Sequence, residues 1–412
     1  MPRYRCGLDW SESAQDYAVL DDKGNVVSEG RILETYEGLK ELLGVLTSPS
    51  TARRHPRKQV PIAIETGRSL LVAALRTAGQ PVVAINPAVV ARYRGRVSPA
   101  KKRKSDQSDA RLLANIIRTD GQLHRTLPGN SEQLLTLVEL SRAQRHAVNQ
   151  QQYYLRRLRS QLRTYYPAAL QAWQGLPKTI LRPEARALLR LAPTPAAAGR
   201  LTRRQIASTL AAAGRVRLIA HHTERLHALF RQRQLRQPPT AEEAMGVAVL
   251  STLTFLECAD QLVHTLAGDM TEVFLAHPQA PIYLSFPGVG PVMGSRLLAE
   301  LGDDPDRFET AKGLRAYAGV APLTWTSGGS RSVSHRRVAN KLLKATCHQW
   351  AFSSLTRSPG ARAHYDRRRA AGDQWTGALR HPAGRLLNCL YHCLASEELY
   401  QEAKAFPPHS GT

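Results

Sequence analysis

Apolar and polar positions divide the chain into three stretches, and the first, to about residue 128, alternates between two periods. Short apolar runs occur in YRCGLDW, in DYAVLDDKGNVVSEGRIL around a turn at Lys23-Gly24-Asn25, in QVPIAIETG and in PVVAINP. These runs predict strands, whereas TYEGLKELLGVL and RSLLVAALRTAG have the spacing of helices. The resulting order is three strands, helix, strand, helix, strand, helix. Such an order predicts an α/β domain with a mixed sheet and helices on its faces.

The middle stretch, residues 129–282, has a helical pattern throughout. Between 130 and 166 a seam recurs at alternating three- and four-residue steps, which predicts one long helix. The seam residues are Leu134, Leu137, Ser141, Gln144, Val148, Gln151, Leu155, Leu158, Leu162 and Tyr165. Two interpretations fit this seam, a bundle helix within one chain and a dimerising coiled coil. A second long helix near 240–276 would return antiparallel to the first.

The last stretch, residues 283–412, predicts a mostly helical domain. SFPGVGPVMGSRLLAELGD forms a Gly-Val-Gly turn into a helix that starts near Pro291, where free backbone N–H groups can seat a phosphate. No uninterrupted apolar run reaches about 18 residues, so no membrane span is expected. The five cysteines are scattered without zinc-site spacing. This usage suits a reducing compartment, and we expect a cytoplasmic, prokaryotic protein acting on the chromosome.

The charge balance adds information about the partner, because the chain has 57 Lys and Arg but only 33 Asp and Glu, for a net charge of +24. A surplus of this size favours a polyanionic partner, with nucleic acid first, although arginine-rich codon usage contributes to it. Residues 91–104, ARYRGRVSPAKKRK, contain seven cations and no acid. We expect a basic loop here that contacts nucleic acid, with an ordinary solvated loop as the alternative. Its cations are Arg92, Arg94, Arg96, Lys101, Lys102, Arg103 and Lys104.

Four carboxylates accompany this basic segment. Asp9 and Glu65 stand at or near the ends of apolar strands, and Asp106 and Asp109 open a helix at positions i and i+3. The aspartate pair alone is equally typical of helix capping. Four acids gathered in one place would repel each other unless a cation bound between them. Carboxylate oxygens suit Mg²⁺, which can activate a phosphodiester.

These residues resemble a known family. Asp9 in GLDWS, Glu65 in IAIETG, AINPAVVARYR and KSDQSDARLLA are similar to the N-terminal domain of the DEDD insertion-sequence transposases, the bridge-RNA-guided recombinases of insertion-sequence family 110. FPGVGPVMGSRLLAELGD, RFETAKGLRAYAGVAP and TSGGS resemble the second domain of that family. The resemblance implies an RNase H-like metal-binding domain over 1–128, a helical coiled-coil and linker region over 129–282, and a transposase domain with a serine loop over 283–412.

The resemblance also implies the site and its partners. Asp9, Glu65, Asp106 and Asp109 correspond to the four metal-binding catalytic acids, with Mg²⁺ as cofactor, and Ser327 corresponds to the catalytic serine. Ser330 and Ser332 are close competitors for that role. The residues expected to contact phosphate beside it are Arg331, His335, Arg336 and Arg337. The implied partners are target and donor DNA, a non-coding bridge RNA, and further copies of the chain in a dimer or tetramer.

Three functions fit these observations. The first is an RNA-guided recombinase that transfers DNA strands through a phosphoserine intermediate. The second is a metal-dependent junction-resolving nuclease that uses the acids alone. The third is a non-catalytic scaffold that binds nucleic acid. The serine loop favours the first over the second, and the presence of all four acids argues against the third.

Overall fold

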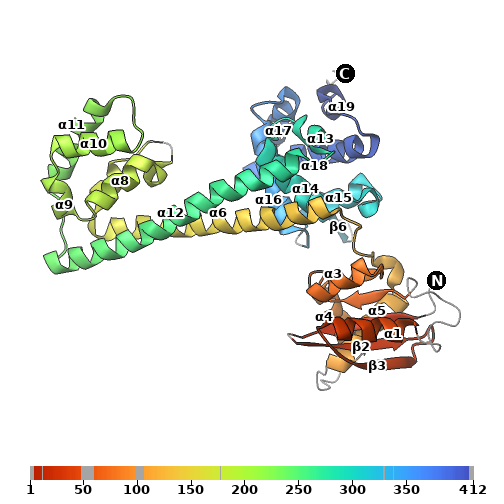
Figure 1. Cartoon of the computed structure of the whole chain (residues 1–412). Helices are drawn as coiled ribbons and strands as arrows, with labels where there is room; N and C mark the ends of the chain where they lie inside the picture. Colours follow the sequence, from red (N-terminus) through yellow and green to blue (C-terminus); the bar gives the residue numbers. More distant parts are fainter. Residues whose placement is uncertain are drawn as a thin grey trace. The chain divides into compact units, whose positions relative to one another are not determined.

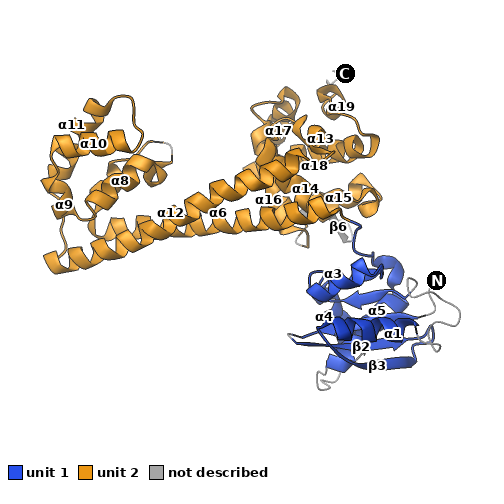
Figure 2. Cartoon of the chain, viewed as in Figure 1, with its two compact units in different colours: residues 1–129 blue, residues 130–412 orange. Residues whose placement is uncertain are grey.

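The computed structural model of the 412-residue chain describes residues 4–11, 13–47, 60–97, 106–176, 178–327, 330–336 and 338–407. For residues 97, 323–327 and 330–335 it describes the backbone alone. The chain divides into two compact units, Met1–Gly129 and Asn130–Thr412 (Figure 2). Each unit has its own hydrophobic core.

The first unit is built on a five-stranded sheet with the strand order β3-β2-β1-β4-β5. Its elements are β1 (Arg5–Trp10), β2 (Ala14–Leu20), β3 (Val26–Leu33), α1 (Tyr36–Thr47), β4 (Ile62–Ile64), α3 (Leu70–Thr77), β5 (Val82–Ala84), α4 (Pro87–Val97) and α5 (Asp106–Thr119) (Figure 1). β1 pairs with β4, and β4 with β5, in parallel, while β1–β2 and β2–β3 are antiparallel. The mixed sheet is confirmed, as is the order of the predicted elements, except that α4 is an additional helix between β5 and α5.

Side chains of β1 alternate between the two faces of this sheet. Cys6 and Leu8 join the core formed with α1 and α3. Gly7 faces the other way and lies against α5, where an added Cβ would be 2.0 Å from the Ala110 carbonyl oxygen and 2.5 Å from the Ala114 nitrogen. Because no side chain fits in that space, Gly7 allows α5 to lie directly on the central strand.

The basic segment differs from the expected loop, because residues 91–97 continue helix α4. Pro87 presets the backbone at the first helical position, and the Asn86 side chain accepts a hydrogen bond from the Ala88 amide at 2.8 Å. The helix ends at Val97, immediately before Ser98-Pro99, as a proline requires. Lys101, Lys102, Arg103 and Lys104 lie outside the described residues.

The second unit is mainly helical. Its longer elements are α6 (Glu132–Tyr165), α8 (Pro183–Leu191), α10 (Arg203–Ala212), α11 (Ile219–Arg231), α12 (Pro239–Leu275), α14 (Pro291–Leu301), α16 (Lys341–Ser354), α17 (Pro359–Ala370) and α18 (Trp375–Ser396). Its shorter helices are α7 (Pro167–Gln171), α9 (Pro195–Arg200), α13 (Ala280–Leu284), α15 (Ala311–Tyr317) and α19 (Glu402–Ala405). One antiparallel hairpin joins β6 (Pro322–Ser327) to β7 (Ser330–His335). A mostly helical remainder beside an α/β domain was predicted, and this is confirmed.

Helices α6 and α12 pack antiparallel along their lengths (Figure 1), since Gln133 contacts Val273 near one end and Thr164 contacts Gln237 near the other. The predicted seam of α6 is buried, although Ala147 occupies the step expected for Val148. The seam is therefore used within the chain, which confirms the bundle-helix interpretation.

The polar middle of the seam consists of paired groups. Gln144 accepts a hydrogen bond from Arg296 at 2.7 Å, and Gln151 donates one to Asp260 of α12 at 2.7 Å. The other Asp260 oxygen accepts from Arg186 of α8 at 2.8 Å. Buried polar pairs at seam positions fix the register between two helices, because any shift leaves them without partners.

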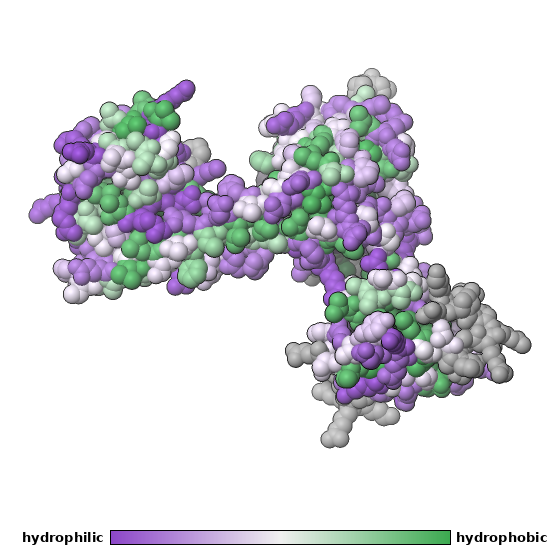
Figure 3. All heavy atoms as spheres, in the orientation of Figure 1, coloured by the Kyte–Doolittle hydropathy of each residue, from purple (hydrophilic) through white to green (hydrophobic). Residues whose placement is uncertain are grey.

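Helix α12 is the one helix in the described part of the chain that is long and apolar enough to cross a membrane. Val249, Leu253 and Leu256 are fully buried in the helical core, so packing within the unit accounts for much of this composition. Hydrophobic residues also remain on the outer surface of the helix pair (Figure 3), among them Val247 and Phe255, which are 66% and 57% exposed.

The C-terminal core forms around Trp350 of α16, which is fully buried and donates its indole N–H to the Pro287 carbonyl at 3.1 Å. The Gly-Val-Gly turn precedes α14, which begins at Pro291 as predicted. Gly288 has φ +78°, and an added Cβ would lie 2.8 Å from the backbone of Ser353 and Ser354. This turn therefore needs glycine both for its conformation and for its close contact with α16.

Candidate active site

Two of the four predicted acids meet at one edge of the sheet. Leu8 and Ile64 are directly paired in the parallel β1–β4 ladder, and Asp9 and Glu65 each come one residue later. Gly7 and Ala63 lie on the α5 face, and since side chains alternate along a strand, Asp9 and Glu65 continue on that face. Both carboxylates are partly buried. The register of the sheet therefore places these two acids side by side.

The other two acids reach the same edge from helix α5. Asp16 is paired with Asp9 across β1–β2, and Arg31 is paired with Asp16 across β2–β3, so all three share a face. The Arg31 guanidinium binds Asp16 at 2.8 Å and Asp106 at 3.3 Å. The N-terminus of α5 is thereby held at the level of Asp9. Asp109 lies one turn further along and is only 3% exposed.

Arginine side chains neutralise two of the predicted acids. Arg94 of α4 binds Asp109 at 2.9 Å, and Arg31 binds Asp106 as described. The pKa of Arg31 is raised above its ordinary value, first by its hydrogen bond to Asp16 and then by the charge of the same carboxylate. Arg94 was predicted to contact nucleic acid, and in this structure its guanidinium forms an ion pair with Asp109. Arg92 and Arg96 of the same helix are exposed.

The carboxylate set fits a hard divalent cation by its donor chemistry. Its present arrangement is that of ion pairs, and no group of three or more His, Cys, Asp or Glu within the described ranges is close enough to hold a metal ion. Arg31 contacts one oxygen of Asp106, Oδ2, and Arg94 contacts one oxygen of Asp109, Oδ1. A cation bound by these carboxylates would compete with the two guanidinium groups for those oxygens.

Asp16 and Arg31 were missed from the sequence. Nothing in the local pattern of DYAVL or EGRIL sets them apart from other polar positions of an edge hairpin. The signal that identifies them is the cross-strand register Asp9–Asp16–Arg31, which depends on the position of the β2–β3 turn.

The predicted serine lies at the end of a strand. Ser327 is the last residue of β6 and is paired with Ser330, the first residue of β7, while Ser332 is paired with Trp325. His335 is paired with Pro322 at the base of the same hairpin, and Arg331 is next to its end. Arg336 follows, partly buried, and its carbonyl accepts a hydrogen bond from Lys344 at 3.4 Å. Arg337 lies outside the described residues.

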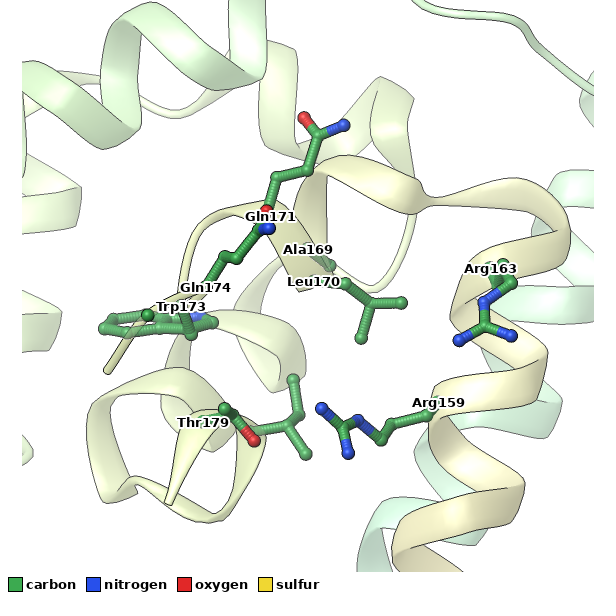
Figure 4. Close-up of a pocket in the computed structure, with 10 residues that line it drawn as sticks. Arg159, Arg163, Ala169, Leu170, Gln171, Trp173, Gln174 and Thr179 are labelled. Carbon is green, nitrogen blue, oxygen red and sulfur yellow. The ribbon is translucent and has the colours of Figure 1, made fainter. Parts of the chain in front are cut away.

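A small cavity of about 300 Å³ lies at the C-terminal end of α6 (Figure 4). Arg159 and Arg163, one turn apart on α6, extend toward it, and Leu170 and Trp173 form part of its opposite wall. Its lining is mainly apolar apart from these arginines and a few amide and hydroxyl groups. We assign no chemistry to it.

An α/β unit with acids at the ends of its central strands, followed by a mainly helical unit, is the arrangement expected of an insertion-sequence transposase, and comparisons with known families establish that class. Residues 6–167 match the model of the DEDD transposases of the IS110 type, and residues 280–366 match the model described as Transposase IS116/IS110/IS902 family. The chain belongs to this IS110 family of transposases, which confirms the resemblance. DNA is accordingly its substrate, and members of the DEDD class generally use divalent metal ions.

Relatives support the assignment over nearly the whole chain. The mini-circle putative transposase for IS117 of Streptomyces coelicolor is 44% identical over 403 residues, which cover 98% of this chain and 96% of that protein. An uncharacterised 44.8 kDa protein of insertion element IS116 from Streptomyces clavuligerus is 27% identical over 391 residues, 94% of each chain. An uncharacterised 42 kDa protein of IS900 from Mycobacterium paratuberculosis is 37% identical over 134 residues, 32% of this chain and 33% of that one.

Proposed function

We propose that this transposase cuts and rejoins DNA by attack of Ser327 on a phosphodiester, with Asp9, Glu65, Asp106 and Asp109 holding Mg²⁺ at the same phosphate. The first unit is then RNase H-like, in keeping with its strand order β3-β2-β1-β4-β5. The observation that supports the proposal is that Asp9 and Glu65 follow paired residues of adjacent parallel strands, while Arg31 holds the N-terminus of α5 at the same edge of the sheet.

In the proposed first step the Ser327 hydroxyl oxygen attacks the scissile phosphorus and loses its proton. The bond between phosphorus and one deoxyribose oxygen breaks, that oxygen is protonated, and a phosphoserine links the chain to the other DNA end. In the second step a deoxyribose hydroxyl of the partner strand attacks the phosphoserine and releases the serine. The number of phosphodiester bonds is conserved, so rejoining needs no external energy source. Bound Mg²⁺ would stabilise the negative charge that develops on the phosphoryl oxygens.

Arg31 and Arg94 have a defined part in this scheme. Without a divalent cation the four acids and Asp16 would repel one another across the short distances of the β1–α5 contact. The two guanidinium groups remove part of that repulsion, so the edge of the sheet can form before metal arrives. Once released from the acids, the same side chains are able to bind DNA phosphates.

We also propose that a non-coding RNA pairs with target and donor DNA, so that the protein holds the nucleic-acid backbone while base pairing selects sequence. The net charge of +24 supports a large polyanionic partner. Recombination would take place in a dimer or tetramer. The outward residues of α12 support an oligomer, since Val247, Phe255 and Leu262 are about half exposed or more and lie on a long helix.

The test uses the full chain, its element DNA and the RNA that purifies with it. Ser327→Ala is expected to abolish the covalent protein–DNA adduct, with Ser330→Ala as the matched control. Asp9→Asn and Glu65→Gln are expected to abolish recombination while DNA binding remains. DNA cleavage by Ser327→Ala would instead identify a nuclease that uses the acids alone. A wild-type protein that never alters a DNA strand with Mg²⁺ and all partners present would be a binding scaffold.

A further inference from the structure

The C-terminal unit contains a second and larger cavity, of about 980 Å³. It is lined from α15, α17, α18 and α19 and from the start of β6. Such a volume lies at the upper end of the range for ligand sites, about 300–1,000 Å³, and exceeds what a single phosphate needs. One wall is a stripe of α18 at four-residue spacing, formed by Arg380, Gly384, Asn388, His392 and Ser396.

Some cations of this cavity are neutralised by neighbouring acids. Arg368 binds Asp373 at 2.7 Å, and Lys404 binds Glu398 at 2.9 Å. These two pairs use both carboxylates that line the cavity. The charge of Arg380 also acts on Asp373, although the two side chains form no ion pair, and no carboxylate of the wall pairs with Arg315 or Arg385 within the described residues.

Three arginines of the cavity, Arg315, Arg380 and Arg385, form no ion pair with a described residue. The Arg315 Nε is buried and has no hydrogen-bond partner in the described part of the chain. Arg380 makes no ion pair to any described residue, and Arg385 donates to the Ala405 carbonyl, which carries no net charge. The Arg315 side chain passes close to α18, since a Cβ added at Gly384 would lie 3.8 Å from the Arg315 Cδ, an ordinary van der Waals contact. Arg315 and Arg380 are partly buried, whereas Arg385 is exposed. A partly buried guanidinium without a counter-ion is costly, and an anion would remove that cost for Arg315 and Arg380.

Two histidines of the cavity hold a proton less readily than a free imidazole. Burial first, and then the nearby Arg367, lower the pKa of His364 to about 4, and burial followed by Arg368 lowers the pKa of His381. The arginines therefore supply the positive charge. Neutral imidazoles, with Asn388 and Gln401, offer hydrogen bonds, while Val320 and Leu399 offer apolar surface. Such a mixture suits a nucleotide strand better than an inorganic ion.

The cavity lies close in sequence to the serine hairpin, which indicates which nucleic-acid strand would bind there. Val320 and Pro322 line the cavity, and Pro322 is the first residue of β6, whose last residue is Ser327. Five residues of extended strand span at most about 17 Å. A stacked strand rises about 3.4 Å along its axis per nucleotide, so about five stacked nucleotides rise through this distance and a more extended strand needs fewer.

We propose that this cavity binds the unpaired DNA strand next to the scissile phosphate, with its phosphates on Arg315, Arg380 and Arg385. The choice of DNA rather than RNA rests on the proposed function, because it depends on Ser327 attacking DNA. The binding of a phosphodiester strand rests on the cavity alone. The site would keep the strand end near the hairpin after cleavage.

The test maps where a strand binds to the full-length protein. A single-stranded DNA 10-mer containing 5-iodouracil is photo-crosslinked, and modified peptides are identified by mass spectrometry. Crosslinks are expected in the α18 peptide that contains Asn388 and His392, and they should disappear in Arg380→Gln. That substitution removes no described ion pair, so the fold should survive, which amide exchange of α18 checks. Arg357→Gln, an exposed arginine outside the cavity, is the control.

Salt dependence gives a second readout. Removing one phosphate-binding cation from a single-strand site should reduce the slope of log K against log salt by about 0.7, so Arg380→Gln should show this change and Arg357→Gln should not. Crosslinks that map elsewhere, or that persist in Arg380→Gln, would overturn the cavity proposal. An RNA 10-mer of matched sequence that crosslinks here in preference to DNA would overturn the DNA assignment.

The two proposals fail separately. If Ser327→Ala removes the covalent adduct while Arg380→Gln crosslinks like wild type, the cavity assignment is wrong and the serine mechanism stands. If crosslinks map to the cavity and disappear in Arg380→Gln while Ser327→Ala still forms the adduct, the cavity binds the strand and the nucleophile lies elsewhere.

Discussion

Replacing Gly7 by alanine tests the contact on which the acid site depends. The new Cβ would lie 2.0 Å from the Ala110 oxygen, whereas real Cβ contacts essentially never fall below 3.0 Å. Helix α5 must therefore retreat from β1 by about 1 Å, since the obstacle is backbone rather than a flexible side chain. Overpacking of this kind costs about 1–3 kcal/mol. The same displacement carries Asp106 and Asp109 away from Asp9.

Hydrogen exchange of the intact chain measures the first effect. A loss of about 1–3 kcal/mol corresponds to roughly 5- to 140-fold faster exchange of the core amides of α5, if they exchange by local opening of the first unit. Peptides of α16 in the second unit serve as an internal reference and should be unchanged. Recombination should fall by about 100-fold, because a misplacement of about 1 Å is enough for such a loss.

Gly44→Ala is the matched control. Gly44 lies inside helix α1, and an added Cβ there meets nothing within 4 Å. Its replacement should stabilise the helix by about 0.5–1 kcal/mol and leave recombination intact. If the amides of α5 exchange as slowly in Gly7→Ala as in the wild type, the close-packing argument is refuted. Faster exchange with normal recombination would show that the acids do not depend on this contact.

Three further predictions concern charge and polarity. Arg94→Gln should raise the affinity for Mn²⁺ roughly fivefold, about 1 kcal/mol, because the guanidinium no longer competes with the metal ion for Asp109. Titration calorimetry measures this affinity, and weaker Mn²⁺ binding would mean that Arg94 holds the carboxylate in place for metal. Asp260→Ala should destabilise the chain to heat by about 1–3 kcal/mol, since the buried Gln151 and the partly buried Arg186 lose their acceptor, whereas Glu257→Ala at an exposed pair should cost about 0–1 kcal/mol; equal losses would contradict this. His364 has its pKa lowered from 6.5 to about 4, so the unfolded chain binds the proton more tightly and stability should fall as pH drops from 6.5 toward 4. Melting temperatures of His364→Asn should depend less on pH over this interval, and parallel curves would refute the assignment.

Most helices and strands of the first unit could be predicted from the sequence, because the hydrophobic repeat that identifies each of them lies within a short segment. Alternation in β1 and β4 and helical spacing in α1 and α3 are decided by neighbours within ten residues. The segment at 91–97 was predicted wrongly as a loop, since its one-sided charge outweighed the helix start at Asn86-Pro87. Charge content alone does not separate a solvated helix from a loop.

The candidate site could be predicted only in part. The four acids could be named from their motifs, whereas the pairing of Arg31 with Asp106 and of Arg94 with Asp109 depends on long-range packing. The same holds for the cavity of the second unit, whose lining comes from residues as far apart as Arg315 and Lys404. Contacts between distant segments leave no periodic trace in the sequence.

The antiparallel pairing of α6 with α12 has a consequence for how this chain can change over time. Because α6 and α12 are antiparallel, residues 166–238 form an insertion between them whose two ends lie close together, with Gln237 donating a hydrogen bond to the Thr164 carbonyl at 3.3 Å. Neither matched family model extends across it, since one ends at 167 and the next starts at 280. Insertions into the connections within this segment would leave the path of the remaining polypeptide unaltered, provided that its helices still cover Val249, Leu253 and Leu256 of α12, so variants of different length can keep the same chemistry.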